Sequence, residues 1–194
     1  MVPIKENLVP KDKYAIKCPY TRTPTRVVIH NTANDAPAAN EISYMRYNDL
    51  EISFHYAVDD VNIVQGIPEN RNAWASGDGH GKGNMEGIHI EICYSKSGGE
   101  KFDKAEQNAA EFTASLLKKY GWGIDKVTKH RDYDGKYCPH RTLDRGWQRS
   151  QYISGCNNDL TSKQIVDWTC PTYAYHDCLV EIEPWDGVVA ESQE

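Results

Sequence analysis

One short stretch of the chain combines an imidazole, an ammonium and a thiol, because His130, Lys136 and Cys138 fall within a span of nine residues. Gly135 and Pro139 interrupt this stretch and no hydrophobic period runs through it, so it has the character of a loop. Imidazole and thiolate are good zinc ligands, and a catalytic zinc usually takes three protein ligands and a water. The stretch therefore predicts two ligands of a zinc site, His130 and Cys138.

The best candidate for the third ligand is His30, which closes the short hydrophobic run 26–30. A β-branched run of this length predicts a buried strand, and a histidine at the C-terminal end of a strand can point into a cleft. The simpler interpretation is a polar residue that only closes the strand. His140 remains an alternative to His130 as a ligand.

A second candidate for chemistry lies in the stretch 87–94, where hydrophobic and polar residues alternate. A strand there would place Ile88, Ile90 and Ile92 on one face, and His89, Glu91 and Cys93 on the other. A carboxylate in the middle of such a strand is costly unless it has a partner or faces a cleft. We therefore predict that Glu91 is a general base with a raised pKa. The alternatives are a zinc ion bound by the three polar residues of this strand, or a Glu91 that pairs with a basic side chain.

Lys136 is two residues from Cys138, so the two side chains point the same way if the segment is extended. A lysine beside the metal can stabilise an oxyanion, whereas the alternative is an ordinary solvated lysine. Asp132 and Asp134 are expected to cap the loop rather than to bind metal.

The remaining pattern predicts the elements that position these residues. Strands are expected at 26–30, 52–58, 61–67, 87–94 and 124–129, and helices at 38–47 and 103–120, after an extended lead-in over 1–25. Asn34 or Asp35 would cap the first helix, Asp103 and Glu106 would form a capping box for the second, and Gly121 would end it.

Two residues outside the main stretches have a structural and a functional interpretation. His55, within the run 52–58, is predicted to be a hydrogen-bonded structural histidine. Trp74 lies in the glycine-rich loop 70–87, which is functional or mobile, and it either forms a wall of a sugar site or anchors the loop.

Length and charge suggest a division of the chain. Its 194 residues suit one catalytic domain over 1–155 with a tail over 156–194, where eight acidic residues and one lysine give a net charge of −7. The first 155 residues therefore carry +1 of the overall −6, without the basic stripe expected of a nucleic-acid binder. Six cysteines are too few for a disulfide scaffold, although a disulfide among the three in the tail is possible. No hydrophobic run suits a membrane span or a signal peptide, so synthesis in the cytoplasm is expected unless a signal has been removed.

Taken together, these residues resemble the type-2 N-acetylmuramoyl-L-alanine amidases. These zinc peptidoglycan hydrolases include phage endolysins and bacterial autolysins, and share their fold with peptidoglycan recognition proteins. The resemblance covers about residues 5–152 and is closest to the endolysin branch found against Gram-positive hosts. The stretches that carry it are Val27–Ala33, Ser53–Asp60, Ile67–Pro68, Asn72–Trp74, Gly87–Tyr94 and His130–Pro139.

The resemblance implies an α/β fold, with a mixed sheet flanked by helices and zinc in a surface groove. It places His30, His130 and Cys138 on the zinc ion, Glu91 as the base and Lys136 near the oxyanion. Some family members have a tyrosine where this chain has Phe54. Tyr56 is two residues on and is expected to face the same side, but we do not transfer the role to it.

The predicted reaction is hydrolysis of the amide between N-acetylmuramic acid and L-alanine in bacterial peptidoglycan, with Zn²⁺ as cofactor. The predicted protein is a monomer without membrane insertion that acts at the cell wall, reached through a membrane pore if it is phage-encoded. A peptidoglycan-binding module without hydrolysis is one alternative, against which the thiol of Cys138 argues. A zinc peptidase that cuts the stem peptide is the other.

Overall fold

The fold is a mixed six-stranded sheet with helices on both faces, which confirms the predicted α/β class. The computed structural model describes residues 1–148, so the tail over 156–194, its cysteines and the domain boundary at 155 lie outside the described residues. The strand order is β1-β4-β3-β5-β2-β6, and β3 and β4 form the antiparallel pair of an otherwise parallel sheet. The strands are β1 (Ile4–Glu6), β2 (Arg26–Asn31), β3 (Tyr56–Val58), β4 (Ile63–Gln65), β5 (Gly87–Ile92) and β6 (Val127–Lys129).

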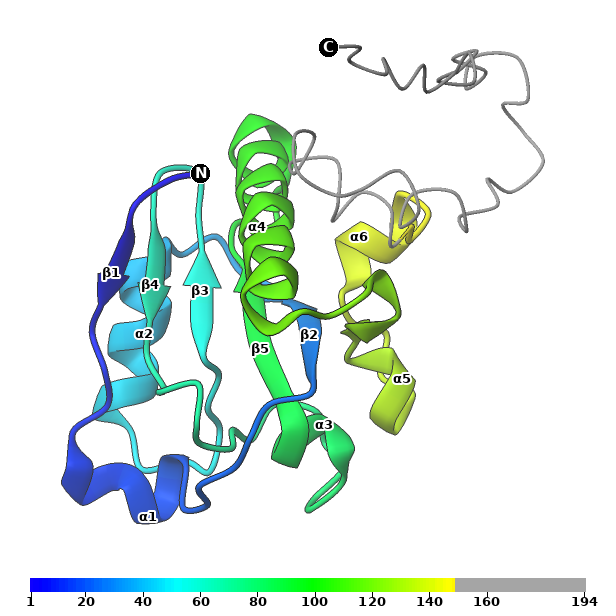
Figure 1. Cartoon of the computed structure of the whole chain (residues 1–194). Helices are drawn as coiled ribbons and strands as arrows, with labels where there is room; N and C mark the ends of the chain where they lie inside the picture. The colour runs from blue at the N-terminus through cyan, green and yellow to red at the C-terminus, as the bar shows by residue number, and fades with distance from the viewer. Residues whose placement is uncertain (149–194) are drawn as a thin grey trace, which may run out of the picture. The chain divides into compact units, whose positions relative to one another are not determined.

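Two longer helices cover the sheet, and shorter ones lie in its connections. In Figure 1, α4 crosses in front of the sheet and α2 lies behind it. The helices are α1 (Tyr14–Lys17), α2 (Ala38–Tyr47), α3 (Lys82–Glu86), α4 (Gly99–Tyr120), α5 (Arg131–Asp134) and α6 (His140–Asp144), with 3-10 turns at η1 (Lys11–Lys13) and η2 (Ile124–Lys126).

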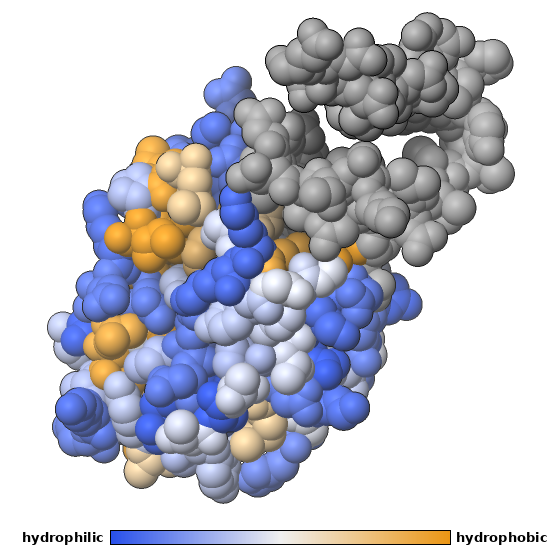
Figure 2. All heavy atoms as spheres, viewed as in Figure 1, coloured by the Kyte–Doolittle hydropathy of each residue, from blue (hydrophilic) through white to orange (hydrophobic). Residues whose placement is uncertain are grey.

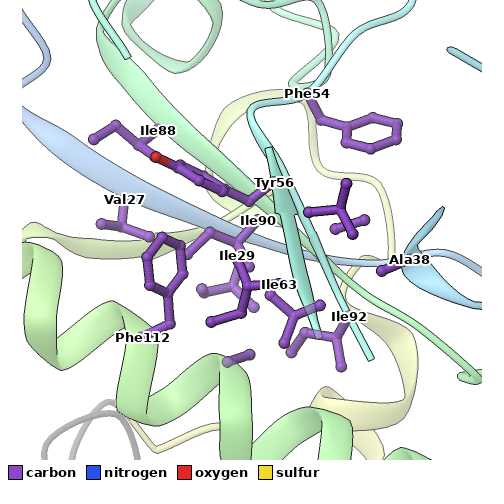
Figure 3. Packing of buried hydrophobic residues seen from close by; sticks show 14 of the residues in the cluster. Val27, Ile29, Ala38, Phe54, Tyr56, Ile63, Ile88, Ile90, Ile92 and Phe112 are labelled. Atoms are coloured by element: carbon purple, nitrogen blue, oxygen red, sulfur yellow. The ribbon is translucent and has the colours of Figure 1, made fainter. Parts of the chain in front are cut away.

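The core forms where α4 packs on the alternating residues of the central strands. Phe112 of α4 points at Ile29 of β2 and Ile90 of β5 (Figure 3), and all three side chains are at most 2% exposed. Each such side chain stabilises the fold by about 1.5–3 kcal/mol through its burial. Because side chains alternate along a strand, the neighbours of Ile29 and Ile90 must point to the opposite face. This face holds the polar residues of both strands.

The face of the molecule seen in Figure 2 is mixed in character. Figure 2 shows a mainly hydrophilic surface with separate hydrophobic patches. Within residues 1–148, no helix has both the length and the hydrophobicity that a membrane crossing requires.

The lead-in over 1–25 is not simply extended, which corrects the prediction. Its strand β1 pairs with β4, and the helix α1 carries Lys17, whose side chain is completely buried. The Lys17 ammonium donates to the side chain of Asn48 at 2.8 Å and to the carbonyls of Leu50 at 2.5 Å and Ile52 at 3.1 Å. A long-range anchor of this kind leaves no local pattern in the sequence.

The first helix has the predicted bounds, but both predicted caps are wrong. Pro37 precedes α2 without capping it, and the carboxylate of Asp59 accepts the amide of Ala38 at 3.0 Å. The predicted cap Asn34 instead donates to Glu41. The second helix, α4, begins four residues before Asp103.

The predicted capping box of α4 is therefore also wrong, because Asp103 and Glu106 pair with Arg145 instead. Gly121 does end the helix, with a left-handed φ of 66°. The strand predicted over 52–58 is shorter, because Ser53 bonds to Lys17 and Trp74 rather than to a neighbouring strand. The return strand is likewise limited to β4, and η2 replaces the first half of the strand predicted over 124–129.

Candidate functional site

The parallel pairing of β2 and β5 brings two of the predicted residues side by side. His30 of β2 is directly opposite Glu91 of β5, on the face away from α4. The side chain of His30 is 1% exposed, whereas that of Glu91 keeps 16%. One carboxylate oxygen of Glu91 is 4.0 Å from Nδ1 of His30. The histidine is thus enclosed, whereas the glutamate side chain is partly exposed.

The chain after β6 brings the other predicted ligands to the same point. β6 pairs with β2, so His130 emerges beside His30. The short helix α5 and Gly135, with a left-handed φ of 81°, then turn the chain back, and the amide of Arg131 donates to the carbonyl of Cys138 at 3.0 Å. This turn returns the thiol to the two imidazoles.

Three ligand atoms converge in the arrangement that results. Nδ1 of His30 is 3.1 Å from Nδ1 of His130 and 3.9 Å from Sγ of Cys138, and the three atoms all lie within 4.8 Å of one another. In a tetrahedral zinc site with bonds of about 2.0–2.3 Å, ligand atoms lie about 3.3–3.6 Å apart. The observed separations bracket these values, so the three residues fit a zinc ion with small adjustments.

The alternative ligand sets are not assembled in the same way. Within residues 1–148, His30, His130 and Cys138 have ligand atoms close enough together to hold a metal ion. The alternative set of His89, Glu91 and Cys93 does not form such a group. His140 contacts the carbonyl of Ser95 at 3.2 Å.

The protonation states of the cluster also suit a cation. Burial lowers the pKa of His30 well below its usual value, and that of His130 less strongly because the Asp134 carboxylate opposes it. Both imidazoles are therefore neutral and able to bind metal. Burial, and then the nearby Glu91 carboxylate, raise the pKa of the Cys138 thiol to about 12. A thiol in this position becomes a thiolate when a cation binds it.

The outer nitrogen of each histidine has its own partner. Nε2 of His130 is 3.1 Å from the Asp134 carboxylate, and Nε2 of His30 is 3.0 Å from Nδ1 of His89. Asp134 also accepts a hydrogen bond from the amide of Lys136 at 2.8 Å, which confirms that it caps the loop. Asp134 therefore has two roles, because it contacts His130 as well. Sequence reasoning missed both outer contacts. The i, i+4 spacing from His130 to Asp134 was the available signal.

Glu91 has the environment predicted for a general base. Burial, with the Glu41 carboxylate as a second cause, raises its pKa to about 8, and the Lys136 ammonium opposes this rise. The carboxylate oxygen Oε2 of Glu91 has no hydrogen-bond partner among residues 1–148. Its other oxygen is 4.0 Å from Nδ1 of His30, but burial lowers the pKa of this imidazole well below its usual value, so the contact brings no positive charge to Glu91 at neutral pH. Lys136 itself is exposed and lines the same groove.

These residues lie in a groove of about 1030 Å³ that reaches well beyond the cluster. Its lining includes Asn40, Glu41 and Tyr44 of α2, and Trp74 and His80 of the glycine-rich loop. A groove of this size exceeds what a small ligand needs and suits an extended one.

The anchoring role of Trp74 is confirmed, since its indole donates to the carbonyl of Ile16 at 3.0 Å. Trp74 also lines the groove, and its role as a wall of a sugar site stays a prediction. The predicted structural role of His55 is confirmed, because Nδ1 accepts the amide of His89 at 3.1 Å and Nε2 contacts the carbonyl of Arg71 at 2.9 Å.

The side predicted for Tyr56 is wrong. Phe54 lines the groove, whereas the ring of Tyr56 packs on Phe112 of α4, with ring centres 4.6 Å apart. Figure 3 shows the two side chains pointing away from each other. Residue 54 precedes β3, so the alternation of a strand does not extend to it. The hydroxyl of Tyr56 is committed to Glu69, which supports leaving it out of the catalytic group.

Comparisons with known proteins agree with one another. The family model for N-acetylmuramoyl-L-alanine amidase matches residues 20–141. The N-acetylmuramoyl-L-alanine amidases XlyB and CwlA of Bacillus subtilis are 59% and 58% identical over 146 residues, which is 75% of this chain and 46% and 54% of theirs. The chain thus spans about half the length of these relatives.

Two solved structures extend the similarity to the fold. The structure of PlyL has a TM-score of 0.77 and 49% identity over 81% of this chain and 99% of its own. The solution structure of the PlyG catalytic domain has a TM-score of 0.76 and 50% identity over 82% of this chain and 98% of its own.

Proposed function

Because the chain belongs to the N-acetylmuramoyl-L-alanine amidase family, we propose that it is a zinc enzyme that hydrolyses the amide between N-acetylmuramic acid and L-alanine in peptidoglycan. One observation carries this proposal. Two imidazole nitrogens and a thiol converge within 4.8 Å of one another, beside a carboxylate, in a long groove. That arrangement contains the ligands and the base that metal-assisted amide hydrolysis requires.

The zinc ion would be held by His30, His130 and Cys138, a donor set with the nitrogen and sulfur ligands that zinc prefers. When bound, zinc polarises a carbonyl and lowers the pKa of water to about 7. Three protein ligands leave a position open for this chemistry, which distinguishes a catalytic from a structural site.

Glu91 would move the proton during the reaction. It takes a proton from the attacking water as the water oxygen bonds to the carbonyl carbon, and passes that proton to the amine of L-alanine as the C–N bond breaks. The raised pKa of Glu91 suits both steps, because the carboxylate is a stronger base and the acid is still formed near neutral pH. Its 16% exposure gives the substrate access to it.

Lys136 would stabilise the negative charge that develops on the carbonyl oxygen. Its amide is held by Asp134 at 2.8 Å, which fixes the start of the side chain beside the site. The ammonium acts electrostatically on Glu91 and on Cys138, so it lies close enough to influence an oxyanion there.

The groove suits a polymer with both sugar and peptide parts. Its aromatic side chains, Trp74 and Tyr44, offer flat faces for sugar rings, and Asn40 offers an amide for peptide groups. We infer that peptidoglycan is the partner, that the protein acts as a monomer at the bacterial wall as an endolysin or autolysin, and that residues 1–155 form the catalytic domain.

The test is to digest purified peptidoglycan and to measure zinc content and products on the same preparations. The wild-type protein is expected to carry one zinc per chain and to release intact stem peptides with free L-alanine amino termini. Glu91→Gln is expected to keep the zinc and to lose at least about 100-fold in turnover. Glu100→Gln, an exposed glutamate at the start of α4, is the matched control and should retain turnover.

Each other outcome would overturn a different part of the proposal. Bound peptidoglycan without released product would indicate a binding module. Fragments cut within the stem peptide would indicate a peptidase. Full activity of Glu91→Gln would refute the role of Glu91 as the base.

A further inference from the structure

We propose that His89 is a positioning residue for the metal ligand His30. Its Nδ1 accepts a hydrogen bond from Nε2–H of His30 and thereby leaves Nδ1 of His30 unprotonated and aimed at the zinc ion. This inference rests on the proposed zinc site and adds a residue that neither touches the metal nor meets the substrate.

The contact between the two imidazoles is short and enclosed. Nε2 of His30 is 3.0 Å from Nδ1 of His89, and the ring centres are 5.2 Å apart. The side chains are 1% and 0% exposed, so water does not replace this contact easily. Buried polar groups are expected to be paired in this way, because an unpaired one costs about 1–3 kcal/mol.

The direction of the hydrogen bond follows from the other contacts of His30. Its Nδ1 faces Nδ1 of His130 and Sγ of Cys138, the point where the ligand atoms converge. A neutral imidazole carries one proton, so a His30 that binds metal through Nδ1 must carry it on Nε2. Nδ1 of His89 is then the acceptor, and the proton of His89 is on its own Nε2, for which the backbone of Gly83 acts as an acceptor.

His89 is itself held in place by its surroundings. Its backbone amide donates to Nδ1 of His55 at 3.1 Å, and the two rings stack with their planes 15° apart. On the other side, a Cβ at Gly87 would lie 3.2 Å from Nε2 of His89 and 2.5 Å from the carbonyl of Gly83. Only a glycine at position 87 leaves room for this packing, so the His89 ring has little freedom to turn.

The choice of a neutral acceptor has a physical reason. His130 uses a carboxylate as its outer partner, and Asp134 can be ionised because its side chain is 28% exposed. The position of His89 is completely buried, and it lies near a site that already holds Glu91 and Cys138. A further buried negative charge there would be costly, whereas a neutral imidazole orients His30 without adding charge.

The test compares two substitutions of similar size in the full chain. His89→Leu removes the acceptor, and His89→Asn places an amide oxygen close to the position of Nδ1. Zinc affinity is measured by competition with a chromogenic chelator, and the unfolding of the metal-free proteins is measured separately. We expect His89→Leu to lose about 10–100-fold in zinc affinity and His89→Asn to stay within about threefold of wild type.

Three results would overturn the inference. The first is a His89→Leu variant that binds zinc as tightly as wild type, and the second is an equal loss in both variants, which would indicate packing rather than a hydrogen bond. The third needs no variant: nitrogen-15 NMR of the zinc-loaded wild-type protein would place the proton on Nδ1 of His89 instead of Nε2.

The experiment separates this inference from the proposed function. A wild-type protein that binds no zinc would refute the zinc enzyme and the inference together. A wild-type protein that binds zinc, with His89→Leu unaffected, would refute the role of His89 alone.

Discussion

Gly77 controls the outer partner of a predicted metal ligand without touching that ligand. A Cβ at Gly77 would lie 2.3 Å from Oδ2 of Asp134 and 3.0 Å from its Cγ. That same oxygen, Oδ2, contacts Nε2 of His130 at 3.1 Å. In Gly77→Ala, the carboxylate must therefore move by about 1 Å to reach an ordinary separation, which breaks or weakens its bond to His130.

The expected magnitudes come from two separate effects. Gly77 has a φ of +67°, so any side chain there costs about 1–2 kcal/mol of stability. Losing the outer partner of a metal-binding histidine typically costs 10–100-fold in metal affinity, which corresponds to about 1.4–2.8 kcal/mol. Gly77→Ala should thus lose about 1–2 kcal/mol of fold stability and, in addition, about 10–100-fold in zinc affinity.

The loop offers a matched control two residues away. Gly79 has a φ of +59°, and nothing lies within 4 Å of a Cβ placed there. Gly79→Ala should therefore show the backbone effect without any displacement of Asp134. Zinc affinity from chelator competition, and urea unfolding of the metal-free proteins, would be measured for both variants. If Gly77→Ala binds zinc as tightly as Gly79→Ala, then Asp134 does not support His130 and the reasoning fails.

Three further predictions concern the predicted ligand Cys138 and two residues away from the site, Lys17 and Glu69. Cys138→Ser should lose both zinc and hydrolysis, because a hydroxyl is a poor replacement for a thiolate; stoichiometric zinc after dialysis would show that Cys138 is not a ligand. Lys17→Met should lower the free energy of unfolding by about 2–4 kcal/mol, since three acceptors lose their donor; an unchanged urea midpoint would refute this. Glu69 has a lowered pKa, because hydrogen bonds from Lys119, Tyr120 and Tyr56 outweigh the opposing effect of burial. Its ionised form therefore stabilises the fold above its ordinary pKa, and the stability advantage of wild type over Glu69→Gln should shrink as the pH falls from about 6 to about 3; a difference independent of pH would contradict this.

The parts of the fold that follow from local patterns were predictable from the sequence. The stretch 87–94 alternates, and β5 does place its isoleucines in the core and its polar residues on the other face. The cap of α2 was not predictable, because Asp59 reaches it from 21 residues along the chain. Capping rules search the neighbouring sequence, and the tertiary fold supplied a different partner.

In the candidate site, too, the residue types were predictable from the sequence and the long-range contacts were not. The residue types of His130 and Cys138 predict two zinc ligands and His30 is the best candidate for the third, whereas the family resemblance is what joins the three into one set. Their outer contacts depend on the register between β2 and β5 and on the path of the turn after β6, which the spacing alone does not determine. For this reason, the shared face of His89 and Glu91 was predictable, but the contact of His89 with His30 was not.

The glycine-rich loop explains how one segment can support both histidines that are predicted to bind zinc. In its middle, Gly77 packs against Asp134, the outer partner of His130, and at its end Gly87 borders His89, the outer partner of His30. At both positions a Cβ would come within 3.2 Å of the outer partner of a ligand. The glycines at these two places therefore act by permitting close packing rather than by giving flexibility. It follows that a substitution at either place should weaken metal binding, although neither glycine lies beside the converging ligand atoms.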